Sequence, residues 1–281
     1  MSADLVPDQL WQRIAPLLPP PPVRRPRYPG RLRIPDRVAL GGIVYVLRTG
    51  VAWRDVPAQL VGCSGVTSWR RLRDWTEAGV WPRLHQNLLA ELRRVGLLEM
   101  DDCAIDGSHV RALKVGIMSG LLPCDRGRPG SKHHVIVDRH GTPLAASVTG
   151  ANRHDVTQLI PLLDAIPRIG GLRGRPRHKP KRLFADRGYD FDKYRRLLRD
   201  RGVKPHIARR GTAHGSGLGR TRWVVERTFA WLHQFKRLRI RYEHRADLHQ
   251  GLVQLACCII CLRRLSKGHH STSPTEGETP Q

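Results

Sequence analysis

Three acidic residues, far apart in the sequence, stand where their carboxylates could act together. Asp106 and Asp186 each end a short apolar run, residues 103–105 and 183–185, and a glycine follows each within two residues. Side chains at such strand ends can face an open cleft. The third acid, Glu226, lies in residues 222–232, which combine an amphipathic helical pattern with several arginines.

The chemistry that suits these carboxylates is the binding of hard cations. A buried charge without a partner is costly, so a strongly basic chain has little reason to bury three acids unless they converge on metal ions. Mg²⁺ takes one or two carboxylates together with water and phosphate oxygens, so three acids suffice for two ions. The residues therefore predict a site for two Mg²⁺ ions, with Mn²⁺ as a substitute, that acts on phosphodiesters.

The charge of the chain predicts a polyanionic partner. The 281 residues include 49 Lys and Arg against 24 Asp and Glu, a formal net charge of +25. Only eight of the 49 are Lys, and the planar fork of Arg suits phosphates and guanine edges. Double-stranded DNA is the expected partner.

Other partners and compartments are disfavoured. No apolar run approaches the roughly 20 residues that cross a bilayer, and the N-terminus carries Asp4 and Asp8 where a signal peptide would be basic. We expect a cytoplasmic protein without membrane contact. The sequence lacks a phosphate-binding Gly-x-x-x-x-Gly-Lys motif, which argues against ATP use. Cys258 and Cys261 have no partner pair at zinc-site spacing, so we expect core thiols.

The first third of the chain has a helical pattern. Residues 1–97 are expected to form a helical DNA-binding domain, with Asp36 capping a helix that ends at Gly50. Ser64 can cap a further helix over 64–75, which is similar to the recognition helix of a helix-turn-helix. Its outward side chains, and so the expected DNA contacts, are Arg70, Arg71 and Arg73. An ordinary exposed basic helix would have the same pattern.

After Gly96 the pattern becomes that of an α/β fold. Strands are expected within 97–110 and at 133–138 and 143–148, lying side by side, and then at 181–186 and 204–208. Helices are expected at 157–166, introduced by a capping box of Asp155 and Gln158, and at 192–201, 220–235 and 246–266. This order predicts a mixed sheet with helices on both faces over residues 98–266, followed by a disordered tail, 267–281.

Several of these motifs occur in the same order in a known family. The chain resembles a bacterial insertion-sequence transposase of the DDE type, in the group of insertion sequences four and five. The matching segments in the second part of the chain are residues 105–112, 150–155, 185–190, 222–231 and 238–242, and residues 10–19 and 50–57 resemble that group's helical leader domain.

The resemblance implies an RNase H-like catalytic domain whose triad is Asp106, Asp186 and Glu226. In this family the glutamate belongs to a signature of Tyr, two residues, Arg, three residues, Glu, six residues, Lys. Arg222 fits the signature, but Gly219 stands in the place of the Tyr and His233 in that of the Lys. The residues expected to hold DNA near the triad are Arg222, His233, Lys236 and Arg237.

The activity that the resemblance implies is binding to terminal inverted repeats, metal-dependent strand cleavage and strand transfer to target DNA, by a homodimer on DNA. Two alternatives remain open: a DNA-binding protein without catalysis, and an RNase H-like nuclease that acts on RNA hybrids. The triad acids taken singly could be turn formers or members of helix salt bridges. Trp223 and Trp231 could stack on an unpaired base, although packing inside the protein is the default for both.

Overall fold

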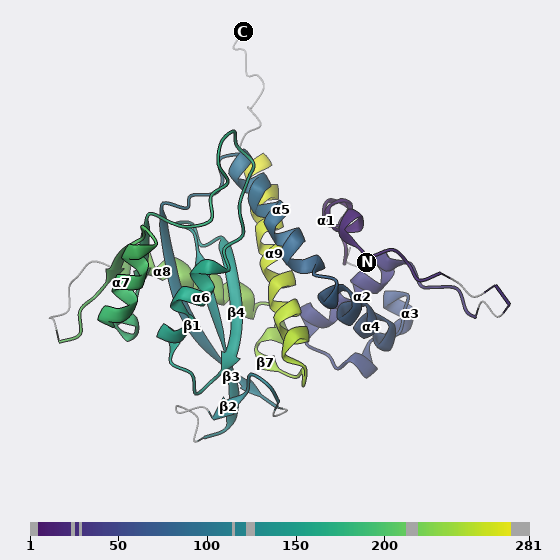
Figure 1. Cartoon of the computed structure of the whole chain (residues 1–281). Coiled ribbons are helices and arrows are strands. Elements are labelled where there is room, and N and C mark those ends of the chain that lie inside the picture. Colours follow the sequence, from purple (N-terminus) through teal and green to yellow (C-terminus); the bar gives the residue numbers. More distant parts are fainter. Residues whose placement is uncertain are drawn as a thin grey trace, which may run out of the picture.

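The computed structural model describes residues 5–23, 26–27, 30–113, 116–121, 127–211 and 219–270. Much of the basic segment 24–31, and residues 271–281 of the expected tail, lie outside the described residues. The first part of the chain is helical (Figure 1), with α1 Asp8–Ile14, η1 Ala15–Leu17, α2 Asp36–Thr49, η2 Trp53–Asp55, α3 Ala58–Val61, α4 Gly65–Glu77 and α5 Val80–Arg94.

Two of the expected helix boundaries are confirmed, and one expected cap is wrong. Gly50 ends α2 with φ 77°, a left-handed conformation that glycine adopts at little cost, and the Ser64 hydroxyl caps α4 by accepting a bond from the Thr67 amide. Asp36 makes no cap bond. Its carboxylate instead pairs with Arg33 and with Arg71 of α4, each at 2.9 Å, so it ties α2 to α4.

The second part of the chain forms a mixed sheet, as predicted. Among the described residues the strands are β1 Asp102–Ala112, β2 Gly120–Leu121, β3 Pro129–Val137, β4 Pro143–Gly150, β5 Arg182–Ala185, β6 Lys204–Ile207 and β7 Ile240–Arg241. Strands β4, β3 and β1 form an antiparallel meander, and β5 and β6 follow parallel to β1, so the central order is β4-β3-β1-β5-β6. This arrangement of strand order and direction is RNase H-like.

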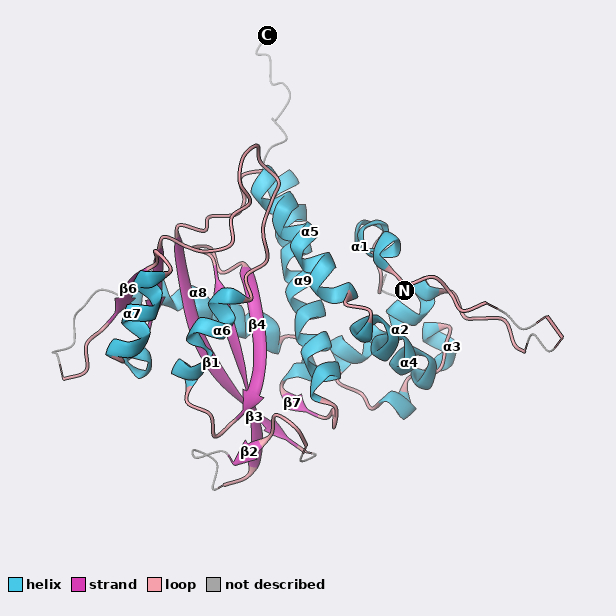
Figure 2. Ribbon diagram, in the orientation of Figure 1, coloured by secondary structure: helices cyan, strands magenta, loops and turns pink. Residues whose placement is uncertain are grey.

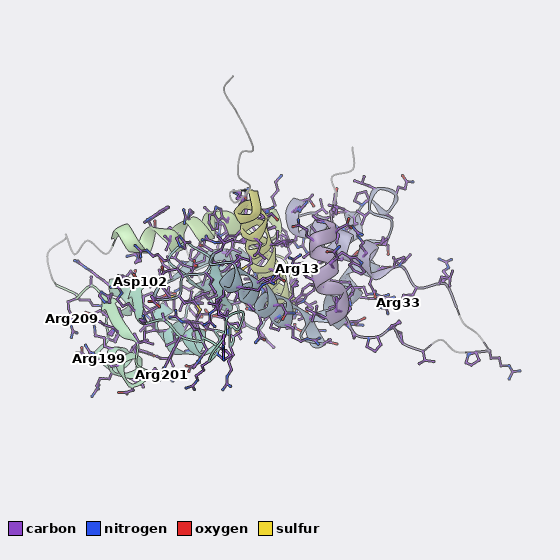
Figure 3. The ribbon with its side chains drawn as sticks, turned by 90° about the horizontal axis from the view of Figure 1, so that it is seen from above. Arg13, Arg33, Asp102, Arg199, Arg201 and Arg209 are labelled. Carbon is purple, nitrogen blue, oxygen red and sulfur yellow. The ribbon has the colours of Figure 1, made fainter. Side chains whose placement is uncertain are left out.

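Helices cover both faces of this sheet. Figure 2 shows α8 Gly219–His233 behind the strands and α6 Leu159–Asp164 in front of them. Short 3₁₀ turns and further helices complete the fold: η3 Asp155–Gln158, η4 Arg187–Tyr189, α7 Asp192–Asp200, η5 Lys236–Leu238 and α9 Ala246–His270. Side chains of α7 and its flanks, including Arg199, Arg201 and Arg209, lie at the opposite end of the molecule from the N-terminal helices (Figure 3).

The expected capping box before α6 is wrong. The η3 turn starts after His154 without a side-chain cap, and the Gln158 side chain accepts a bond from Ser147 instead. The Asp155 carboxylate turns to the sheet and lies 3.0 Å from the Lys132 ammonium group of β3. An ion pair with a buried lysine has therefore replaced the local cap.

Helix α9 joins the two parts of the chain. It packs against α4 and α5 of the first part and against β4 and α8 of the second, and one hydrophobic core spans both parts. The helix is long and apolar enough to cross a membrane, but 78% of its most apolar window is buried inside the protein, so it serves as the core helix. Cys258 and Cys261 are buried free thiols in it, as expected. It runs to His270, so residues 267–270 are helical rather than part of a disordered tail.

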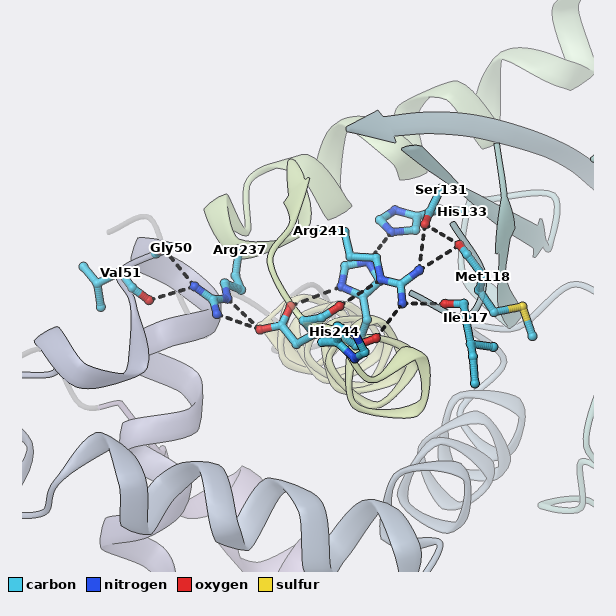
Figure 4. A network of polar contacts seen from close by, with 11 residues as sticks. Gly50, Val51, Ile117, Met118, Ser131, His133, Arg237, Arg241 and His244 are labelled. Atoms are coloured by element: carbon cyan, nitrogen blue, oxygen red, sulfur yellow. Dashed lines mark hydrogen bonds and ion pairs between the residues drawn. The ribbon is translucent and has the colours of Figure 1, made fainter. Parts of the chain in front are cut away.

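A buried polar network lies beside this core (Figure 4). The Arg237 guanidinium group donates to Glu243 at 2.7 and 2.9 Å and to the carbonyls of Gly50 and Val51. His249 lies 3.4 Å from the other Glu243 oxygen, and its Nε2 is 2.8 Å from Nε2 of His133. We call Arg237, Glu243, His249 and His133 the Glu243 network. It fixes the end of α2 to the segment that precedes α9.

Candidate active site

Asp106 lies within β1 rather than at the end of a strand, because β1 continues to Ala112 alongside β3. The strand pairing nevertheless changes around Asp106. The pairing of β1 with β5 ends at Ala104, and its pairing with β7 begins at Arg111, so among the described strands only β3 accompanies the residues between. Asp106 therefore lies beside a gap in the sheet between β5 and β7.

Asp186 follows β5 directly, as the sequence predicted. It is the N-cap residue of η4, and its Oδ1 accepts a bond of 2.8 Å from the Gly188 amide. This bond leaves the second carboxylate oxygen without a hydrogen bond of its own turn. The strands β1 and β5 are parallel neighbours. Asp186, at the carboxyl end of β5, therefore lies at the same edge of the gap as Asp106.

Glu226 is on α8, whose packed side is Val225, Phe229 and Leu232, as the periodicity predicted. The Glu226 side chain is 63% exposed. One nitrogen of Arg222 lies 3.4 Å from a Glu226 oxygen and 3.9 Å from a carboxylate oxygen of Asp106. A guanidinium group thus stands between the acid of the helix and the acid of the strand.

The electrostatics of Asp106 indicate a shortage of positive charge. Burial raises the pKa of this carboxyl to about 6, and the negative charges of Asp186 and Asp155 add to the effect. The Gly107 amide, at 2.8 Å, and the charge of Arg222 act in the opposite direction without cancelling it. A nearby cation would favour the ionised form of this carboxyl and lower its pKa.

The donor chemistry fits Mg²⁺ or Mn²⁺, since Asp106, Asp186 and Glu226 offer oxygen ligands only. The three acids are not gathered, however. Within the described ranges, no group of three or more His, Cys, Asp or Glu is placed to hold a metal ion. The structure brings Asp106 and Asp186 close enough for their charges to interact, and it connects Glu226 to Asp106 through Arg222.

Sequence reasoning missed a polar cluster on the other side of β1. Asp155 pairs with Lys132 and also lies 3.7 Å from Nδ1 of buried His134. The Lys132 ammonium group donates a second bond, to the Arg153 carbonyl. A Cβ at Gly107 would stand 2.8 Å from an Asp155 oxygen, so the glycine makes room for this acid. The signal was present in the matching segment 150–155, but the local cap offered a simpler interpretation of Asp155.

Tyr189 is a second residue whose role the sequence did not show. It is 1% exposed, and its hydroxyl has no hydrogen-bond partner among the residues that the structure describes. Burial raises its pKa well above the usual value, and the charges of Asp106, Asp155 and Asp186 raise it further. A buried, unpaired hydroxyl near three acids is a group that can donate to a ligand or water at the site.

The arginines of α4 differ in their freedom to meet DNA. Arg70 is exposed. Arg71 is 12% exposed in its side chain and bound to Asp36, which corrects the expectation that it points outward. Arg73 bonds to Asp74 and lies over the ring of Trp69. Arg70 is thus the member of this group best placed for a phosphate.

The expected DNA contacts after Glu226 also separate into two kinds. Lys236 is exposed, and His233 is partly buried, with its pKa lowered by burial and by the charge of Arg239. Arg237 is 3% exposed and belongs to the Glu243 network. We therefore do not retain Arg237 as a DNA contact, because its guanidinium group is committed to buried partners.

Comparison with known proteins agrees with this fold. Residues 98–261 match the "Transposase DDE domain" family, and residues 6–85 match the family described as "Putative transposase of IS4/5 family". The chain belongs to the DDE transposase family and is a transposase of an insertion element.

Individual relatives agree with this assignment. The "Putative transposase for insertion sequence element IS402" of Burkholderia cepacia is 61% identical over 153 residues, which are 54% of this chain and 72% of the relative. The "Insertion element IS402 uncharacterized 16.2 kDa protein" of the same organism is 52% identical over 124 residues, 44% of this chain and 84% of that protein. The "Transposase for insertion sequence element IS1106" of Neisseria meningitidis serogroup B is 27% identical over 159 residues, 52% of this chain and 49% of that protein.

Among solved structures, the Mos1 mariner paired end complex with Mn covers 85% of this chain and 80% of its own chain, with 10% identity and a TM-score of 0.24. A similarity this small carries no argument about the site.

Proposed function

We propose that this transposase cuts DNA at the terminal inverted repeats of its insertion element and joins the ends to target DNA, with Asp106, Asp186 and Glu226 as the metal-binding triad. The observation that carries the proposal is the pair of Asp106 and Asp186 beside the gap in the sheet, with the pKa of Asp106 raised to about 6. Glu226 must approach this pair to complete the triad. The Arg222 side chain, now between them, would move to the substrate phosphate.

When bound, two Mg²⁺ or Mn²⁺ ions supply the charge that activates the attacking oxygen and stabilises the leaving oxygen of an in-line displacement. The protein residues have separate tasks. The triad holds the ions, Arg222 neutralises a phosphate oxygen, and the Tyr189 hydroxyl donates a hydrogen bond within the site. In cutting, water attacks the phosphodiester and frees a 3′-hydroxyl; in strand transfer, this hydroxyl attacks a target phosphodiester, so that one such bond forms as another breaks. Hydrolysis is downhill and transesterification conserves the number of phosphodiester bonds, so the reaction needs neither ATP nor a covalent protein intermediate.

The N-terminal helices, with exposed Arg70 on α4, would bind the repeat sequence, and Lys236 and His233 would hold DNA nearer the acids. Bringing two ends together would require a homodimer on DNA. Because its substrate is DNA, the protein would act in the cytoplasm, at the nucleoid.

A nicking and strand-transfer assay on DNA from the ends of the element tests this proposal. Wild-type protein should cut only with Mg²⁺ or Mn²⁺. Asp106→Asn, Asp186→Asn and Glu226→Gln should each reduce cutting by about 10³-fold or more, the loss of several kcal/mol of transition-state stabilisation. All three should still shift end DNA in a gel. The surface variant Asp101→Asn is the matched control, since Asp101 pairs with Arg177 and Lys181 away from the gap. Full strand transfer by any triad variant would remove that residue from the site, and binding without metal-dependent cutting by the wild type would favour the non-catalytic alternative.

A further inference from the structure

A row of aromatic and cationic side chains runs along α8 beside the face that carries Glu226. Trp223, Arg227 and Trp231 recur every fourth residue and therefore lie one above another. The guanidinium carbon of Arg227 is 4.3 Å from the ring centre of Trp223 and 5.0 Å from that of Trp231. Arg227 is itself held by a 2.7 Å bond to the His140 carbonyl. The two indole rings are thus fixed in place by a cation that is already bonded.

These rings are not ordinary core residues. Trp223 is 48% exposed and Trp231 is partly buried, whereas Val225 and Leu232 on the packed side of the same helix are 0% exposed. Trp231 also packs against the hydrophobic core, which holds its ring in place while part of it stays open. Aromatic rings with an exposed part suit the stacking of nucleobases, which all present a flat face.

The row leads to a cavity of about 540 Å³ between α8 and the second half of α9. This is within the range of roughly 300–1,000 Å³ that is typical of ligand sites. None of the residues that line the cavity is acidic, and they are Thr142, Trp231, Gln234, Ile260, Arg263, Arg264, Ser266 and Lys267.

The charge around the cavity favours an anion. Arg263 is exposed, with its guanidinium carbon 5.4 Å from the ring centre of Phe235. The acid whose charge acts on Arg264 and Arg227 is Asp138, which is 0% exposed. Its oxygens accept bonds from the backbone amides of residues 99, 140 and 142. This carboxylate is therefore screened from a ligand in the cavity.

We propose that the Trp223–Arg227–Trp231 row and the α8–α9 cavity bind an unpaired DNA strand, with a base against Trp231 and a phosphate on Arg263. The inference rests on the proposed function, because it takes the strand to come from the acidic site. From Arg222, which contacts Asp106, to Trp231 the helix rises about 14 Å at 1.5 Å per residue. At the duplex spacing of about 3.4 Å per nucleotide this distance equals roughly four nucleotides, and an extended single strand spans it with fewer. The strand leaving the cutting point can thus reach the cavity along one helix.

The test measures binding with the full-length chain in chelator, so that it does not depend on cutting. The probe is a DNA duplex with a single-stranded overhang that carries 2-aminopurine, and a blunt duplex is its counterpart. Wild-type protein should quench the 2-aminopurine fluorescence. Trp231→Ala should abolish quenching and weaken binding of the overhang probe about tenfold, the loss of one base–aromatic stack. Trp231→Phe, which keeps a ring, should retain most of both.

Exposed Arg263 provides a second variant at a residue outside the hydrophobic core. Arg263→Ala should lower the slope of log affinity against log salt by about 0.7, the value for one phosphate contact on a single strand. Arg199→Ala is the matched control, because it removes one exposed arginine on α7, a helix that packs against α6 and β6. Its slope and quenching should equal those of the wild type.

Two outcomes would overturn the proposal. In one, Trp231→Ala and Arg263→Ala behave as Arg199→Ala does. In the other, they lose as much affinity for the blunt duplex as for the overhang, which would assign the surface to duplex DNA. A wild type that quenches the overhang in chelator but never cuts end DNA would contradict the proposed function alone.

Discussion

The Glu243 network and the acids beside the sheet gap each combine carboxylates with an arginine, but the charges of the two groups are balanced differently. In the Glu243 network, burial alone would raise the pKa of Glu243, but the bond from His249 and the charge of Arg237 outweigh it and lower the pKa to about 2. Beside the sheet gap, the pKa of Asp106 is raised to about 6, since Arg222 at 3.9 Å does not offset burial and the neighbouring acids. The first group is complete within the protein, whereas the second lacks positive charge. The difference indicates that the Glu243 network holds parts of the fold together, whereas the acids beside the gap are suited to a positively charged ligand.

The largest effect on stability is expected from removing the cation of the Glu243 network. Arg237→Ala leaves Glu243, which is 5% exposed, without its cation, and breaking a buried pair in this way costs about 3–5 kcal/mol. Denaturant unfolding should show this loss. The matched control is Arg245→Ala, which removes an exposed partner of Glu77 and Asp247 and should cost less than about 1 kcal/mol. Equal losses in the two variants would contradict the distinction between the groups.

Acid should also weaken the Glu243 network. Since the folded pKa of Glu243, about 2, lies below its usual value of 4.5, its contribution to stability is present above pH 4.5 and is lost as the pH falls toward 2. At about 1.4 kcal/mol per pKa unit, the contribution is on the order of 3 kcal/mol. Unfolding of wild-type protein and Glu243→Gln, compared from pH 6 to pH 3, should show a stability gap that narrows in acid. A constant gap would mean that the charge of Glu243 does not matter.

The ionisation of Asp106 should have the opposite effect on stability. Its folded pKa is about 6 against a usual value of 3.8, so its ionisation destabilises the metal-free protein as the pH rises through this window. Asp106→Asn should be more stable than the wild type at pH 7.5 by on the order of 1–2 kcal/mol, a value reduced for partial exposure, and equal to it near pH 4. Added Mg²⁺ should raise the melting temperature of the wild type more than that of the variant. A variant less stable than the wild type at pH 7.5 would show that the carboxylate is already compensated.

The smallest change in stability is expected at Tyr189. Tyr189→Phe removes a buried hydroxyl without a partner, so stability should change by less than about 1 kcal/mol. Metal-dependent cutting should nevertheless fall about tenfold if the hydroxyl donates to a group at the site, in the usual range for one hydrogen bond. Tyr194→Phe on α7 is the control for a partly exposed tyrosine. Unchanged cutting by Tyr189→Phe would leave the residue a packing role.

The sequence predicted what local pattern controls. Short apolar segments separated by turn residues predicted β1, β3 and β4, and these strands lie side by side because antiparallel strands that follow each other along the chain tend to pair. Helical periodicity assigned the buried and open sides of α8 correctly, which put Glu226 on the open side. The strand end at Asp186 was equally local, since the turn that follows is closed by its own side chain.

Contacts between distant residues could not be predicted in this way. Arg71 pairs with an acid on another helix, Asp36, and Arg237 reaches the carbonyls of Gly50 and Val51 far back in the sequence, so both looked like free surface arginines. The polar residues after Asp106 looked like the end of a strand, but pairing with β3 carries β1 on to Ala112. In each case a partner outside the local window decided the outcome.

Helix α9 contacts α4 and α5 as well as β4 and α8. The helices proposed to bind the repeat and the sheet proposed to cut the DNA therefore pack on the same helix. Under the proposed function, this arrangement would fix a distance along the DNA. The interval between the recognised bases and the scissile bond would be set by the length of the protein's own frame, and lengthening that interval by half a helical turn of DNA would present the wrong side of the duplex to the acids.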